Sequence, residues 1–193
     1  QQAVTESNHT LKVVVPVFPR ISNHTDFDAL RLHPDVQCEF VSLQDPCPSA
    51  DLIILPGSKN VINDLRALKQ ADWQEKIQRH LRYGGRVLGI CGGYQMLGKS
   101  VHDPMGIENA RPGETEAGLG LLDCQTTLQP QKQLRQCDGD LQLGSTTTAL
   151  SGYEIHCGET DSRERAPIRF VDGRHDGSIS TDGAVLGLSL IHI

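Results

Sequence analysis

The sequence predicts an α/β fold with a mostly parallel β-sheet, helices on both faces and an antiparallel extension in the C-terminal half. Two observations carry this prediction. Through about residue 100, short apolar runs alternate with segments whose apolar residues recur at helical spacing. From residue 119 onward, short strand-like runs are separated only by turns. The chain of 193 residues is long enough to bury a core as one domain.

The first half supplies four predicted strands, at residues 12–18, 36–43, 51–55 and 86–90. A polar, turn-rich segment follows the first strand. A short helix is expected over residues 26–32, where Pro34 ends it.

Two further helices are indicated between the third and fourth strands. Their apolar stripes are Val61, Leu65 and Leu68, and then Trp73, Ile77 and Leu81. Ser58 is the expected N-cap of the first of these helices. Residues 92–97 begin another helix directly after the fourth strand.

The C-terminal half supplies five predicted strands, at residues 119–128, 140–147, 153–156, 168–171 and 184–188. We expect them to extend the same sheet in antiparallel fashion. Residues 1–10 are expected to form a polar tail or linker, and residues 11–193 the domain itself. Because no Met begins the chain and no apolar signal core follows, we expect a fragment or a processed product.

Composition excludes several classes of function. The net charge of −6 argues against a broad nucleic-acid or anionic-membrane surface. No run of 18 apolar residues is present, so no membrane span is expected. The six cysteines form no C-x-x-C pair, so neither a metal site nor a disulfide scaffold is expected. We therefore expect free thiols and a cytoplasmic location.

Residues 89–95, G-I-C-G-G-Y-Q, carry the clearest chemical signal. A buried strand runs directly into a helix, and Cys91 stands at the corner between small residues, as in a nucleophile elbow. The helix N-terminus is expected to lower the pKa of the thiol from about 8.5 and so favour the thiolate. The N–H of Gly92 is expected to face the oxyanion of a tetrahedral intermediate.

The strand over residues 51–55 ends in a turn whose backbone N–H groups, at Gly57 or Ser58, are candidates to complete the oxyanion hole; an ordinary turn is the alternative. A general base is also needed. The histidine candidates are His24, His156, His175 and His192. In a strand, His156 shares its face with Glu154.

The motif at residues 89–95 resembles the nucleophile motif of class I, triad-type glutamine amidotransferases, whose fold is flavodoxin-like. Residues 20–28, 55–60 and 152–156 further resemble the C-terminal glutaminase domain of the cobyric acid synthases. The resemblance extends over about residues 11–187. It implies Cys91 as the nucleophile, Gly57 and Gly92 as oxyanion donors, and Gln95 and Ser58 as substrate-binding residues.

The resemblance also implies a biological role. Such a domain takes ammonia from glutamine for the ATP-dependent amidation of adenosylcobyrinic acid a,c-diamide in cobalamin (vitamin B12) synthesis. ATP and Mg²⁺ belong to an N-terminal synthetase domain of the same polypeptide, through which the corrinoid substrate is bound. We expect that domain to be absent from this chain, which itself would bind no cofactor.

The C-terminus departs from the family pattern T-Y-L-H-G, in which the histidine is the base. Gapless counting places the base position at Ile191, and His192 follows it, so we expect a truncated C-terminus. His192 and His156 remain the candidate bases. Two alternatives stay open: an impaired glutamine-binding or interaction domain, and another cysteine hydrolase, such as one resembling dienelactone hydrolase.

Overall fold

The computed structural model describes residues 10–22, 24–109, 111–130 and 133–193. Its central sheet has six strands, and all their pairings are parallel except the one at an outer edge. In spatial order the strands are β13 (Ser178–Ile179), β14 (Val185–Leu188), β4 (Arg86–Ile90), β3 (Leu52–Leu55), β1 (Leu11–Val17) and β2 (Val36–Ser42). The predicted mostly parallel sheet is confirmed.

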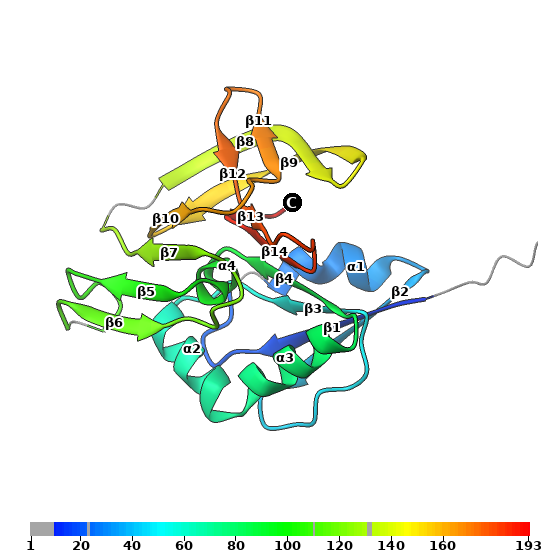
Figure 1. Ribbon diagram of the computed structural model, residues 1–193, viewed down its shortest axis with the longest axis horizontal. Helices are drawn as coiled ribbons and strands as arrows, with labels where there is room; N and C mark the ends of the chain where they lie inside the picture. The colour runs from blue at the N-terminus through cyan, green and yellow to red at the C-terminus, as the bar shows by residue number, and fades with distance from the viewer. Residues whose placement is uncertain (1–9, 23, 110, 131–132) are drawn as a thin grey trace, which may run out of the picture.

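One face of this sheet is covered by α2 (Val61–Gln70) and α3 (Trp73–Arg82), which lie below it in Figure 1. Leu65, Leu68 and Ile77 are fully buried there, because the predicted apolar stripes face the strands. The N-cap of α2 is Asn60, whose side chain accepts a hydrogen bond from the N–H of Asn63, so the assignment of Ser58 as N-cap is wrong.

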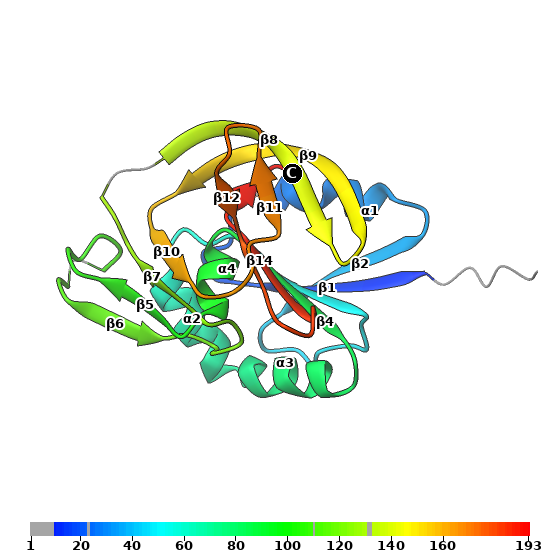
Figure 2. The ribbon, with the colours of Figure 1, turned by 45° about the horizontal axis from the view of Figure 1, so that its top comes forward.

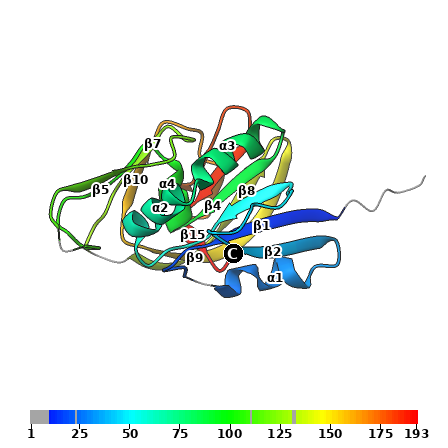
Figure 3. The same ribbon diagram turned by 90° about the horizontal axis from the view of Figure 1, so that it is seen from below.

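The opposite face of the sheet has a mixed cover. The short helices η1 (His24–Phe27) and α1 (Asp28–Leu32) lie across the sheet from α2 and α3 (Figure 3). Phe27 is buried against Val13 and Val15 of β1. Helices on both faces are thus confirmed, although α1 is short. A second sheet covers the rest of this face.

The second sheet arches over the central one (Figure 1). Its strands, in spatial order, are β12 (His175–Asp176), β11 (Ile168–Phe170), β8 (Gln133–Leu143), β9 (Thr146–His156) and β15 (Leu190–Ile191). Ile168, Leu188 and Leu190 join both sheets in one apolar cluster. Residues 140–147, predicted as one strand, contain the turn of the long β8–β9 hairpin, where Gly144 has a φ of 58°.

A third sheet lies at the end of the molecule opposite β2 (Figure 2). Its strands, in spatial order, are β10 (Glu159–Ser162), β7 (Cys124–Thr127), β5 (Ser100–Asp103) and β6 (Glu114–Ala117). Of the strand predicted over residues 119–128, only β7 forms. Leu119 and Leu122 are instead buried in the loop before it.

The C-terminal strands therefore extend the central sheet only in part. β13 is its antiparallel edge, whereas β14 runs parallel to β4. The other C-terminal strands form separate sheets. The helices η1 and α1 cover only part of one face of the central sheet, and the second sheet buries the rest of that face.

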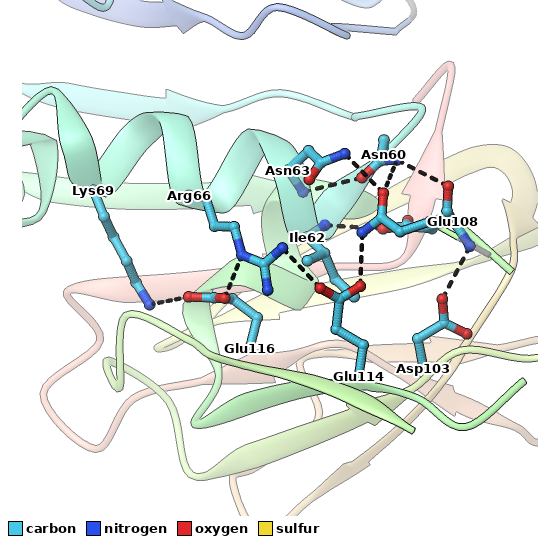
Figure 4. Close-up of polar contacts among 10 residues, drawn as sticks. Asn60, Ile62, Asn63, Arg66, Lys69, Asp103, Glu108, Glu114 and Glu116 are labelled. Atoms are coloured by element: carbon cyan, nitrogen blue, oxygen red, sulfur yellow. Dashed lines mark hydrogen bonds and ion pairs between the residues drawn. The ribbon is translucent and has the colours of Figure 1, made fainter. Parts of the chain in front are cut away.

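A polar network joins the segment after β5 to the start of α2 (Figure 4). The carboxylate of Glu108 accepts hydrogen bonds from the N–H groups of Val61 and Ile62, each at 2.9 Å. Arg66 donates to Glu116 at 2.7 Å and pairs with Glu114 at 2.8 Å. These contacts fix the turn between β3 and α2, because they satisfy N–H groups that a helix start leaves free.

Candidate active site

Cys91 occupies the corner between β4 and α4 (Gly92–Leu97). Its φ is 52° and its ψ −110°, in a region that residues with a side chain rarely adopt. Two backbone hydrogen bonds hold this corner: the N–H of Cys91 donates to Leu188 O at 2.8 Å, and its carbonyl accepts from Gln95 at 3.1 Å. The predicted strained elbow is therefore present.

Glycines around Cys91 are required by close backbone approaches. A Cβ at Gly93 would lie 2.1 Å from the carbonyl oxygen of Leu55, and one at Gly92 would lie 2.9 Å from the backbone nitrogen of Ser58. The helix α4 thus crosses the end of β3 without room for side chains. As a result the turn that contains Gly57 lies directly beside the elbow, as predicted for the carboxyl ends of neighbouring parallel strands.

Burial dominates the environment of the Cys91 thiol. Burial raises its pKa to about 11; a hydrogen bond from the Gly92 N–H acts in the opposite direction, and the charges of Asp26 and Asp176 raise the pKa further. The expected lowering of the pKa is wrong, because desolvation outweighs the hydrogen bond from the Gly92 N–H at the start of the helix. The Gly92 N–H is directed at the sulfur, and its role as a donor to the oxyanion, which forms on the substrate's carbonyl oxygen, stays a prediction.

A cleft of about 1020 Å³ opens in front of Cys91. Gln95 lines it from the next turn of α4 and is only 6% exposed. Its side-chain amide makes no hydrogen bond to another residue within the described ranges, and its Nε2 faces the Cα of Gly158. A buried amide without a partner beside the nucleophile is well placed to meet a polar ligand.

Ser58 contributes less than predicted. Its hydroxyl donates to the buried carboxylate of Asp64 at 2.6 Å and accepts from the N–H of Asn60 at 3.0 Å. The Ser58 hydroxyl therefore makes its hydrogen bonds to residues that follow it in the chain and not to the cleft. We retain two predictions for this turn: Ser58 as a substrate-binding residue and Gly57 as an oxyanion donor. Both roles would have to use the backbone N–H groups of these residues.

The C-terminal strand carries an isoleucine where the family pattern has its base. Ile191 is 3% exposed and shares an apolar cluster with Cys91 and Ile155, whose carbonyl accepts from the Cys91 thiol at 3.5 Å. His192, at the place of the family's glycine, has a φ of 51°. The chain therefore keeps the backbone conformation that a glycine favours, while position 191 carries a side chain that cannot accept a proton.

The imidazole of His192 is directed elsewhere. Its Nδ1 lies 2.7 Å from Oδ1 of Asp26, and its ring packs edge-on against Tyr153. Burial raises the pKa of Asp26, and His192 lowers it. Within the residues that the structure describes, no histidine ring is hydrogen-bonded to Cys91.

The other histidine candidates are dispersed. His24 lies in η1 beside the ring of Phe40, and His175 lines the outer part of the cleft. The backbone of His156 ends β9, but its side chain lies outside the described residues. Sequence reasoning missed Asp26 as a site residue, although it lies in the segment 20–28 that carries the resemblance.

Asp176 is a second missed residue of the cleft. It accepts from the N–H of Ser189 at 3.0 Å and from the Ser189 hydroxyl. Burial raises the pKa of its carboxyl, and the bonds from Ser189 oppose that shift. No local pattern predicts this placement, because it depends on how the strand that contains Asp176 packs beside the segment after β14.

Two sites of other kinds find no support among the described residues. Residues 93–100 match the letters of a phosphate-binding loop, G-x-x-x-x-G-K-S. The structure places these residues in helix α4 and at the start of β5, so they form no loop around a phosphate. No group of three metal-ligating side chains gathers among the described residues.

The fold and the site define a class of protein: an α/β enzyme domain with a cysteine elbow between a parallel strand and a helix. A family model described as a CobB/CobQ-like glutamine amidotransferase domain matches residues 12–193. The chain therefore belongs to that family.

Solved structures agree on the fold. The PurLQS structure from Thermotoga maritima matches with a TM-score of 0.67 and 19% identity, over 94% of this chain and 87% of that one. A glutamine amidotransferase from Thermotoga maritima matches with a TM-score of 0.61 and 15% identity, over 94% and 76%. The expected amidotransferase-like fold is confirmed. No helix in the described part of the chain combines the length and apolar character needed to cross a membrane.

Proposed function

We propose that this chain is the glutaminase domain of a cobyric acid synthase. One observation supports it above the others: Cys91 stands at a strained elbow with the Gly92 N–H against its sulfur and the buried, unpartnered amide of Gln95 in the same cleft. In this proposal glutamine is the substrate. Ammonia passes to the ATP- and Mg²⁺-dependent synthetase domain of the same polypeptide, in the cytoplasm, and amidates adenosylcobyrinic acid a,c-diamide in cobalamin synthesis.

The proposed chemistry has two stages. The Cys91 sulfur adds to the side-chain amide carbon of glutamine, and the C–N bond breaks to release ammonia and leave a thioester. Water then adds to the thioester and releases glutamate. Both stages pass through an oxyanion, which the N–H of Gly92 and a backbone N–H at residues 57–58 would stabilise.

A second candidate function is favoured by Ile191. With an isoleucine at position 191, in the apolar cluster on which Cys91 packs, and the His192 ring on Asp26, the chain has no placed base for thioester hydrolysis among its described residues. The domain would then bind glutamine and form the thioester, but turn over slowly. Membership of an amidotransferase family weighs against the other cysteine hydrolases.

The first test is the intact mass after incubation with 6-diazo-5-oxo-norleucine, a glutamine-analogue electrophile. We expect one adduct on the unaltered chain and on Cys157→Ser, a neighbouring-cysteine control, and none on Cys91→Ala. An adduct that persists on Cys91→Ala would refute the assignment of the nucleophile.

Ammonia release from glutamine separates the two candidates. Steady turnover supports an active glutaminase, whereas a burst of one equivalent followed by slow release supports the impaired domain. If the unaltered chain forms no adduct and releases no ammonia, both candidates fail.

A further inference from the structure

Two sheet edges border the cleft in front of Cys91. β10 is the terminal strand of the third sheet, and β12 is the terminal strand of the second. All four residues of β10 and both residues of β12 line the cleft. Within the described residues β10 is paired only with β7, so the backbone groups on its other side have no strand partner. Such an edge is a template for another extended chain.

The cleft is larger than glutamine requires. Its volume of about 1020 Å³ lies at the upper end of the range for sites that bind drug-sized ligands. Cys91 and Gln95 line it together with β10, which begins one residue after Gly158, and a Cβ added at Gly158 would lie 2.9 Å from Nε2 of Gln95. A glutamine held beside Cys91 and Gln95 therefore leaves the β10 edge uncovered.

Charge determines what kind of segment fits this edge. The cleft is lined by five carboxylates and two guanidinium groups; the carboxylates belong to Glu154, Glu159, Asp161, Glu164 and Asp176. The guanidinium of Arg174 is paired with Glu154 and Asp172. Glu159 and Asp161, both exposed on β10, make no ion pair with any other described residue. Anionic ligands, including a polycarboxylate corrinoid, would be repelled, and cationic side chains attracted.

The same edge is joined to the nucleophile helix by hydroxyl groups. The Ser162 hydroxyl at the end of β10 lies 2.6 Å from the Ser178 hydroxyl, which lies 2.5 Å from the hydroxyl of Tyr94 on α4. Ser178 is fully buried and Tyr94 is 3% exposed. Two hydrogen bonds in series thus connect β10, on which a chain segment would dock, to the helix that follows Cys91.

We propose that β10 is a docking edge for an extended, lysine- or arginine-bearing segment of the protein partner that receives the ammonia. The segment adds a strand next to residues 159–162, and its cationic side chains meet Glu159 and Asp161. Identifying the partner as the protein that receives the ammonia rests on the proposed function, but the addition of a cationic strand to β10 does not.

The test uses a fluorescein-labelled peptide of alternating lysine and valine, eight residues long with blocked termini, and the full chain. We expect saturable binding by anisotropy below 1 mM at low salt, with amide chemical-shift changes at residues 159–162. The same peptide with every second amide N-methylated, and a glutamate–valine peptide, should bind at least about tenfold more weakly.

Protein variants locate the site. E159K/D161K should weaken binding of the lysine–valine peptide at least about tenfold, and the milder E159Q/D161Q less. D138K/D140K, a matched charge reversal on β8, should leave it unchanged. Retained labelling of Cys91 by 6-diazo-5-oxo-norleucine shows that each variant is folded and that the glutaminase assignment stands independently.

Three results would overturn the proposal: no binding at 1 mM, equal binding of the N-methylated peptide, or unchanged binding to E159K/D161K. If Cys91 of the unaltered chain is not labelled by 6-diazo-5-oxo-norleucine but the peptide still binds, the proposed function is refuted and the docking edge is not.

Discussion

The corner at Cys91 and the C-terminal strand that faces it differ in how they are specified. The corner depends on backbone: a positive φ at Cys91, a hydrogen bond to Leu188 O, and glycines that allow α4 to cross the end of β3. The C-terminal strand keeps its backbone too, with β15 paired to β9 and a φ of 51° at His192. Its chemistry depends on one side chain, and at position 191 that side chain is isoleucine.

This difference shows that the backbone geometry of a site and the reactive side chains that it carries are specified separately. Several backbone contacts act together at Cys91, so its geometry is held by many residues. A general base is a single imidazole, and the structure has no second position that replaces it within the described chain.

The largest expected effect comes from giving the C-terminal strand a histidine. Ile191→His combined with His192→Gly should accelerate release of glutamate from the thioester by at least ~100-fold, because a general base would then face Cys91. The measurement is steady-state ammonia release from glutamine. His192→Gly alone is the control and should show no acceleration; an equal gain in the control would mean that His192 blocks the site.

The corner should tolerate no added volume. Gly93→Ala places a methyl group 2.1 Å from the carbonyl oxygen of Leu55, so we expect a loss of about 3 kcal/mol in the free energy of unfolding. Gly113→Ala is the control, since its φ is 81° but no atom lies within 4 Å of the added methyl. It should cost about 1–2 kcal/mol in urea denaturation. Equal costs would contradict the close crossing of α4 over β3.

The pH dependence of Cys91 alkylation should reveal whether burial or the helix N-terminus dominates the pKa of the thiol. Alkylation requires the thiolate, and burial raises the pKa to about 11. The rate with iodoacetamide, followed by peptide mapping, should therefore rise about tenfold for each pH unit between 7 and 9.5. A plateau below pH 8 would show that the helix N-terminus prevails over burial, as the sequence alone suggests.

The smallest expected effect is at His192. The His192 side chain is 41% exposed, whereas its partner Asp26 is only 6% exposed and keeps the hydrogen bond from the backbone N–H of residue 192. His192→Ala should therefore lower the free energy of unfolding by about 1 kcal/mol. Labelling of Cys91 by 6-diazo-5-oxo-norleucine should be unchanged. A loss of labelling in this variant, with folding intact, would make His192 part of the catalytic machinery after all.

Part of the candidate site was accessible from sequence because it is local. The elbow needs only residues 89–95, and its consequences for Cys91 and Gly92 follow from a strand that runs directly into a helix. The helical stripes of α2 and α3 are local in the same sense. Ser58 was misassigned as the N-cap because Asn60, two residues later, competes for the same role.

Other features depend on contacts between distant segments. The pKa of Cys91 is set by burial under β9 and β15 together with Asp26 and Asp176 from other elements, and no local pattern encodes that environment. The direction of the His192 ring likewise depends on Asp26, 166 residues away in the sequence.

The sequence by itself determined the parallel core, the cysteine at its elbow and the identity of residue 191, because short-range periodicity and residue chemistry are properties of the chain alone. Only the tertiary structure decided that the C-terminal strands form two separate sheets and that the β10 edge faces the cleft. The sheet that a strand joins, and the side of it that stays exposed, depend on which apolar surfaces from distant parts of the chain pack together. That packing is a property of the folded molecule and not of any local segment.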